Sequence, residues 1–207
     1  MILLALILAF GQDRLQAQVN LLRNGSFDNG FTYWTLSYGG LVTINYSTSV
    51  QQYADGSTGA VGLSWITTLY QNIPTMIGQQ YDFYFYMADW GPNGVPDNVV
   101  YLSPSFGDIS LGTVSFSGAG HTYLNMGWEK FDFTVTADST TTPVTFYNPA
   151  VYPSNSRWPA IDDVWVTPIP EPSVCGLTLL GVIISASLLR KRMPPNTARA
   201  CVKTPAE

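Results

Sequence analysis

Cysteine and histidine are scarce in this sequence, and each shortage excludes a class of site. The two cysteines, Cys175 and Cys201, lie near the C-terminus, so residues 18–166 cannot form a disulfide. His121 is the only histidine. Without thiols and with one imidazole, residues 18–166 cannot build a zinc or copper centre of the usual kind or a Cys-His nucleophilic pair. A metal that prefers oxygen ligands, such as calcium, is compatible with the composition.

Positive charge is also rare. Between Gln18 and Pro168 there are eleven acidic and three basic side chains, which leaves a net charge near −8. This excess of negative charge argues against nucleic acid and anionic lipid as partners, because both are themselves negatively charged. Polysaccharide, protein and cation partners are all compatible with it.

Signatures of catalysis are missing as well. A glycosidase needs two carboxylates facing each other across a cleft, and Glu129, the single glutamate of residues 18–166, has no partner that the sequence identifies. His121 lies in a glycine-rich loop near Ser117, but no Gly-x-Ser-x-Gly elbow surrounds any serine. We therefore expect a protein that is not an enzyme and rank glycan hydrolysis last among its functions.

Strand-forming residues in alternating order dominate the middle of the chain. Apolar side chains occupy every second position in residues 81–88, and residues 130–136 and 144–147 alternate in the same way. Shorter strands are expected at 41–46, 60–66, 69–73, 99–102, 109–116 and 161–166. Turn residues separate these runs, and no amphipathic helix is visible. The pattern predicts one all-β domain over residues 18–166, an antiparallel β-sandwich.

Both ends of the chain are apolar. Residues 1–10 are almost wholly apolar, and Ala17 provides a small residue for cleavage, so residues 1–17 are expected to be a helical signal peptide. Residues 173–189 carry no charge over 17 positions, long enough for a single transmembrane helix. A basic stop follows and orients that helix with this end in the cytoplasm: Arg190, Lys191 and Arg192.

A short motif directly precedes the apolar segment. Residues 167–172 form a proline-rich linker that ends in Pro170, Glu171 and Pro172, which a plain membrane anchor would not require. The order of motif, apolar segment and basic stop resembles the PEP-CTERM sorting signal of Gram-negative bacteria. The resemblance implies a substrate of exosortase, held briefly in the inner membrane and then moved to the cell surface or extracellular matrix. The chain departs from that pattern because residues 193–207 add a tail, expected to be disordered, after the basic stop.

A second resemblance covers the domain. Residues 20–28 followed by Trp34, residues 69–83 and residues 128–164 resemble the opening, central hairpin and closing strands of galactose-binding-like jelly rolls, which include several families of carbohydrate-binding modules. This implies a jelly-roll β-sandwich whose first and last strands meet. In such modules a structural calcium is often held there, which by position implies Asp28 and Asp162. The residues alone fit equally well a turn closed by Asp28 and an exposed strand position for Asp162.

Aromatic residues are the predicted ligand contacts. All six tryptophans lie within residues 18–166: Trp34, Trp65, Trp90, Trp128, Trp158 and Trp165. Sugars pack their C–H faces on exposed aromatic rings, while carboxylates and amides bind their hydroxyls. Trp90 and Trp158, each in a polar loop, are the predicted contacts with extracellular polysaccharide, and the other four are expected to pack in the core or at its rim. The alternative is a membrane-anchored structural protein that binds no glycan.

Overall fold

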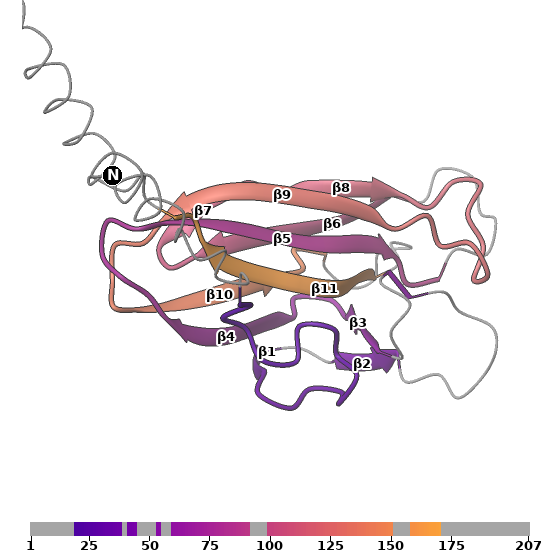
Figure 1. Ribbon diagram of the computed structural model, residues 1–207. Coiled ribbons are helices and arrows are strands. Elements are labelled where there is room, and N and C mark those ends of the chain that lie inside the picture. Colours follow the sequence, from indigo (N-terminus) through magenta and orange to yellow (C-terminus); the bar gives the residue numbers. More distant parts are fainter. Residues whose placement is uncertain are drawn as a thin grey trace, which may run out of the picture. The chain divides into compact units, whose positions relative to one another are not determined.

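Strands form the regular structure of the described part of the chain. The computed structural model describes residues 19–38, 41–44, 53–54, 59–91, 99–150 and 158–170, and these ranges contain eleven strands and no helix (Figure 1). One sheet has the order β1 (Thr35–Tyr38), β4 (Thr68–Pro74), β10 (Thr141–Tyr147), β6 (Val99–Phe106) and β7 (Ile109–Ser110), and β8 (Val114–Ser117) also pairs with β6. The other sheet has the order β2 (Leu41–Ile44), β3 (Ala60–Leu63), β11 (Pro159–Pro168), β5 (Gln80–Asp89) and β9 (Glu129–Thr136).

Every pairing between these strands is antiparallel. The two sheets form a sandwich, which confirms the predicted fold class. No helix within the described ranges is long and apolar enough to cross a membrane. The predicted signal peptide (1–17), the apolar segment (173–189), the basic stop, and Glu171 and Pro172 lie outside the described residues.

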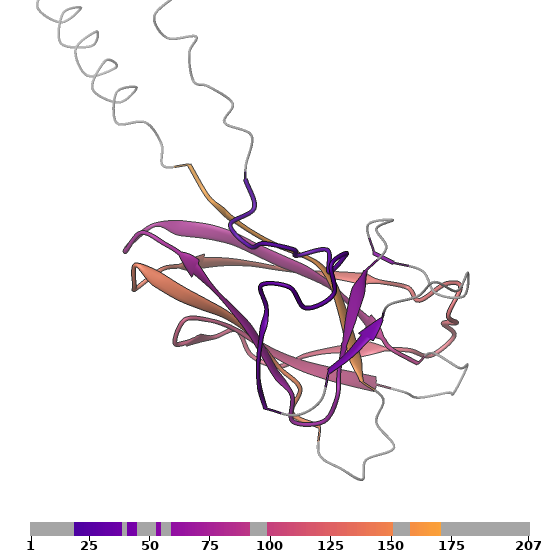
Figure 2. The same ribbon diagram turned by 90° about the horizontal axis from the view of Figure 1, so that it is seen from below.

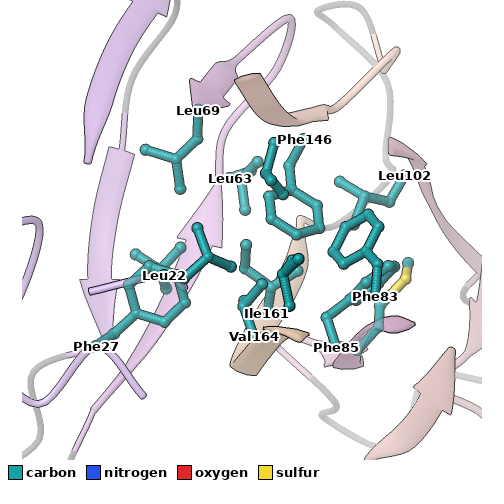
Figure 3. Close-up of a cluster of buried hydrophobic side chains, with 14 of the residues drawn as sticks. Leu22, Phe27, Leu63, Leu69, Phe83, Phe85, Leu102, Phe146, Ile161 and Val164 are labelled. Carbon is teal, nitrogen blue, oxygen red and sulfur yellow. The ribbon is translucent and has the colours of Figure 1, made fainter. Parts of the chain in front are cut away.

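The alternation read from the sequence decides which side chains enter the core. In β5 the side chains of Tyr81, Phe83, Phe85 and Met87 are at most 3% exposed. Phe146 of β10 meets Phe83 and Phe85 from the opposite sheet, with ring centroids 6.0 and 5.0 Å apart (Figure 3). Burying each phenylalanine stabilises the fold by about 1.5–3 kcal/mol, so these contacts hold the two layers together.

The first described residues lie against the last strand. The Leu21 N–H donates to the Val166 carbonyl at 2.9 Å, and the Val164 N–H donates to the Gly25 carbonyl at 3.0 Å. The Asn20 amide group bridges the same stretch, donating to the Val164 carbonyl and accepting from the Val166 N–H. The opening segment and β11 therefore lie side by side within the sandwich, as expected for a jelly roll, although residues 21–30 form bends and turns rather than a strand (Figure 2).

Two expectations about individual strands were wrong, and one strand was missed. Residues 69–83 do not form a hairpin, because β4 and β5 lie in different sheets and residues 75–79 cross between the layers. Strands β4 and β5 pack their apolar faces against the same core from opposite sides. Two strands paired in one sheet would lie on the same side of that core. The run 109–116 contains two strands, β7 and β8, separated around Gly112, whose φ is +80°. Strand β1 was not predicted.

Candidate functional site

The outward face of β11, β5 and β9 gathers aromatic and charged side chains from three neighbouring strands. Alternate residues of a strand share one face, and the inward set fills the core, so the remaining set points away from it. Strand pairing places these outward residues in rows: Thr167, Asp82 and Thr134 in the first, Trp165, Tyr84 and Asp132 in the second, and Tyr86 with Lys130 in the third.

This face is hollowed. An open hollow of about 510 Å³ is lined by Asp82, Tyr84, Lys130, Asp132, Trp165 and Thr167. Small-molecule sites commonly have volumes of about 300–1,000 Å³, so the hollow is large enough for a ligand of a few rings. It combines apolar ring surface with carboxylate and hydroxyl groups.

Two parallel aromatic side chains, Tyr84 and Trp165, line the hollow, and we call this pair its aromatic floor. The Tyr84 and Trp165 rings are nearly parallel, with an interplanar angle of 3° and centroids 6.2 Å apart. Tyr86 meets Tyr84 edge-on at 6.4 Å. All three side chains are half-buried, so part of each ring is open to solvent. Half-exposed rings held in fixed orientations are suited to pack on a flat apolar partner.

A lysine lies over one ring of this pair, that of Tyr84. The Lys130 ammonium is 2.9 Å from the Asp132 carboxylate and 4.0 Å from the centre of the Tyr84 ring. Both partners of the ion pair are solvent-exposed, at 41% and 59% of the side chain. An exposed pair of this kind contributes only about 0–1 kcal/mol to folding stability. Its main consequence is to place a cation between a carboxylate and an aromatic face.

The Tyr84 hydroxyl is held in its protonated form. Partial burial raises the pKa of Tyr84 to about 12, from an ordinary value of 10.0, and the negative charge of Asp163 adds to the effect, followed by Tyr86 and Asp132. Around neutral pH this phenol is therefore uncharged and can donate a hydrogen bond at the edge of the hollow.

Trp90 and Trp158, the predicted ligand contacts, do lie together. Their ring centroids are 5.2 Å apart, and Trp65 meets Trp158 edge-on at 5.3 Å. The backbone N–H of Trp90 donates to the backbone carbonyl of Trp158 at 2.9 Å, and a Cβ at Gly62 would lie 2.7 Å from the Trp90 ring. The three indoles are half-buried. Ligand contact by Trp90 and Trp158 stays a prediction.

Asp162 and Asp28 have different environments. Asp162 is completely buried rather than an exposed strand residue, and its carboxylate accepts the N–H groups of Ala54 and Asp163 at 2.9 and 2.7 Å. A bulge after Asp162, with Asp163 at φ +44°, makes this burial possible. Asp28 is exposed and accepts the Ser26 hydroxyl. In the described ranges no three His, Cys, Asp or Glu side chains form a metal-binding group. The calcium site stays a prediction.

The sorting motif begins where the sheet ends. The Ile169 N–H donates to the Gln80 carbonyl at 2.9 Å, and the Ile169 carbonyl accepts from the Gln79 amide at 2.6 Å. The next residue, Pro170, is exposed. Glu129, the carboxylate considered for hydrolysis, is exposed at the start of β9 and does not line the hollow.

Sequence reasoning missed the Tyr84–Trp165 pair. Trp165 was assigned to core or rim packing, although Val164 and Val166 on either side of it are fully buried and alternation directs Trp165 outward. That signal was available in the sequence. What was not available was the pairing of β11 with β5, which places Trp165 directly opposite Tyr84.

Solved structures with a similar fold include carbohydrate-binding modules. A family 61 carbohydrate-binding module in complex with β-1,4-galactotriose matches with a TM-score of 0.50 and 18% identity, covering 73% of this chain and 99% of that chain. The CBM22-1 xylan-binding domain of Xyn10C from Paenibacillus barcinonensis matches with a TM-score of 0.51 and 11% identity, covering 75% and 98%. These likenesses show the fold, and they confirm a β-sandwich of the carbohydrate-binding-module type.

Sequence comparison gives the family. No curated protein matches the chain. Residues 16–167, which include every described strand except the last residue of β11, match the family described as "Protein of unknown function (DUF642)". Because this match covers well over half of the sequence, the chain belongs to the DUF642 family.

Proposed function

We propose that the outward face of β11, β5 and β9 binds a glycan. The observation that carries this proposal is the Tyr84–Trp165 pair on the floor of a hollow lined by carboxylates. Such a site offers the two kinds of contact that sugars need, a flat apolar surface for their C–H faces and polar groups for their hydroxyls. The carbohydrate-binding modules that share the fold support the proposal by analogy.

The rows of side chains define how a sugar chain would be held. One sugar ring packs on Tyr84 and Trp165, while Asp82 and Asp132 accept hydrogen bonds from its hydroxyls and the protonated Tyr84 hydroxyl donates one. Because the hollow is open to solvent, further units of the chain can continue past it. The proposed role is binding without catalysis.

The test is a glycan array probed with the full chain, followed by affinity measurements on each hit. We expect Tyr84→Ala and Trp165→Ala each to weaken binding by about tenfold or more, since each removes one half of the aromatic floor. Trp90→Ala and Trp158→Ala are the matched variants, because they remove half-buried aromatic rings outside the hollow. If only Trp90→Ala and Trp158→Ala lose binding, the glycan site lies at the predicted loops of these two residues instead.

A structural matrix protein is the alternative outcome of the same array. If no polysaccharide binds the folded chain, the hollow is not a glycan site and a structural role within the matrix replaces it. Circular dichroism of each variant checks that the fold is intact, so that an unfolded variant is not mistaken for a lost contact.

We further infer that the chain is exported and sorted to the cell surface or extracellular matrix of a Gram-negative bacterium by exosortase. Pro170, Glu171 and Pro172, the apolar segment 173–189 and the basic stop support this inference. The exposure of Pro170 directly after the last sheet hydrogen bond also supports it, because a processing enzyme must reach its motif. The mass of the protein from cells with and without exosortase is the test, and an unprocessed mass in both would contradict sorting.

We also propose a structural calcium held by Asp28 and Asp162. A Cβ at Gly59 would lie 2.2 Å from the Phe27 carbonyl oxygen, so the start of β3 lies against the loop of Asp28, and β3 pairs with β11 just before Asp162. Calcium bound only by the folded state raises the melting temperature. We expect a chelator to lower the melting temperature of the parent chain and to leave that of Asp28→Asn unchanged. No effect on the parent chain would exclude the site.

A further inference from the structure

The hollow on β11, β5 and β9 carries more negative than positive charge. Asp82 and Asp132 line it, and the charge of Asp163 reaches the Tyr84 hydroxyl and helps to raise the pKa of Tyr84. Lys130 is the one basic side chain that lines the hollow. Three carboxylates and one ammonium leave this face with a net charge of −2. The other basic side chain of the described ranges, Arg23, lies over the Tyr33 ring at 5.3 Å.

Lys130 shows which chemical group this face accommodates. Its ammonium is 2.9 Å from a carboxylate oxygen of Asp132 and 4.0 Å from the centre of the Tyr84 ring. A carboxylate for charge and an aromatic face for cation–π attraction are the contacts that an alkylammonium ligand requires. Lys130 has a flexible stem and is solvent-exposed, so a ligand ammonium can take its place at little cost.

From these contacts we propose that the hollow prefers glycans with free, protonated amino groups, such as de-N-acetylated amino sugars, over neutral and acidic glycans. The inference deepens the glycan binding proposed above and rests on it. Tyr84 and Trp165 contact the sugar ring, and the carboxylates of Asp82, Asp132 and Asp163 attract its ammonium.

Acidic glycans fit this face poorly. A uronate carboxylate or a sulfate would approach three aspartates, and like charges repel at these distances. The single cation that could attract such a group, Lys130, is already paired with Asp132. Neutral glycans meet no repulsion, but they gain nothing from the net charge.

The experiment compares β-1,4-linked hexamers of glucosamine, N-acetylglucosamine and glucose, which differ only in the group at carbon 2, and a hexamer of glucuronic acid. Calorimetry uses the full chain in mild detergent at about pH 6, where a sugar amine is protonated. We expect the glucosamine hexamer to bind about tenfold more tightly than the two neutral hexamers in low salt. The difference should fall to about twofold in ~1 M salt, where the Debye length is about 3 Å.

Variants distinguish the effect of the charges in the hollow on binding from the effect of the net charge of the whole protein. Asp82→Asn with Asp163→Asn should lower the affinity for the glucosamine hexamer to that for the neutral hexamers, whose own binding weakens less because an asparagine side-chain oxygen still accepts hydrogen bonds. The matched control is Asp108→Asn with Asp138→Asn, which removes the same charge from two exposed turns outside the hollow and should keep the preference. Lys130→Gln should tighten binding of the glucosamine hexamer further, because it removes the competing ammonium.

The outcomes are distinct. Equal affinity for the glucosamine and neutral hexamers overturns this inference and leaves the proposed glycan site in place. Tighter binding of the glucuronic acid hexamer also overturns it and assigns Lys130 as the ligand contact. If the turn variants abolish the preference as fully as the hollow variants do, the inference is reduced to an effect of net charge alone. Binding of no hexamer, with no hit on the array, removes both the inference and the proposed function.

Discussion

Tyr84 is the residue on which the candidate site depends. Its ring is parallel to Trp165, meets Tyr86 at its edge and lies under the Lys130 ammonium, so three neighbouring side chains fix its position. Its hydroxyl lies within the influence of Asp163 and Asp132 and keeps its proton well into alkaline solution. A neutral, oriented phenol is a hydrogen-bond donor, whereas a phenolate at this place would add a further negative charge to the hollow.

The raised pKa predicts a change in stability with pH. Unfolded, Tyr84 loses its proton near pH 10; folded, it keeps the proton to about pH 12. The folded state therefore binds more protons in this window, and its stability falls as the pH rises from about 10 to about 12, with the full contribution present below pH 10. Tyr84→Phe should lack this part of the decline.

Urea unfolding of the parent chain and of Tyr84→Phe across that window is the measurement. The difference between the two free energies of unfolding should be constant below pH 10 and should shift in favour of the variant above it. A difference that stays constant up to pH 12 would contradict the assigned environment of Tyr84.

At the scale of elements, β11 connects the parts of the domain. It pairs with β3 on one side and β5 on the other, it receives residues 20–25 of the opening segment, and it carries Trp165 on its outward face. The bulge after Asp162 changes its register, so the residues beyond it meet β5 with Trp165 opposite Tyr84. A bulge of this kind re-aims side chains, and it also directs Asp162 into the interior.

The opening segment packs on β11 with no space to spare. A Cβ at Gly25 would lie 2.1 Å from the Val164 carbonyl oxygen, which is a backbone atom that cannot move aside without displacing β11. We expect Gly25→Ala to destabilise the domain by about 2 kcal/mol or more, as other substitutions that force atoms into a packed interior do. Ser26→Ala is the control, since the Ser26 hydroxyl binds only the exposed Asp28, and it should cost less than about 1 kcal/mol. Thermal unfolding of both variants is the measurement, and equal losses would contradict the close packing.

At the scale of the whole molecule, the two faces of the sheet that contains β11, β5 and β9 have different roles. The inward face supplies the core and therefore stability, while the outward face supplies the hollow and contributes little to stability. Phe85 is an example of the inward face, because it is fully buried and packs on the rings of Phe131 and Phe146. Trp165 is an example of the outward face, because it is half-exposed.

This division predicts opposite results for two aromatic substitutions. Phe85→Ala should lower the free energy of unfolding by about 3–5 kcal/mol, a large part of the stability of a domain of this size. Trp165→Ala should lower it by clearly less, yet remove glycan binding. Chemical denaturation and binding measured on the same preparations test the pair, and a Trp165→Ala protein as unstable as Phe85→Ala would place Trp165 in the core after all.

The sequence by itself determined the longer strands, their inward faces and the sandwich, because period-two alternation is a local property of neighbouring residues. It identified β5, β9 and β10 with the correct inward-facing side chains, and the resemblance to galactose-binding-like jelly rolls placed the opening segment beside the closing strand. The signal, the membrane segment and the sorting motif are also local patterns, and they stay predictions from sequence.

Only the tertiary structure decided where the hollow lies. Tyr84, Lys130 and Trp165 are far apart in the chain, and they meet because β11 and β9 pair with β5 on either side in one particular register. A shift of one residue in either pairing would turn an entire set of side chains to the other face. Register depends on contacts between distant segments and on the bulge after Asp162, and no local pattern in the sequence encodes either.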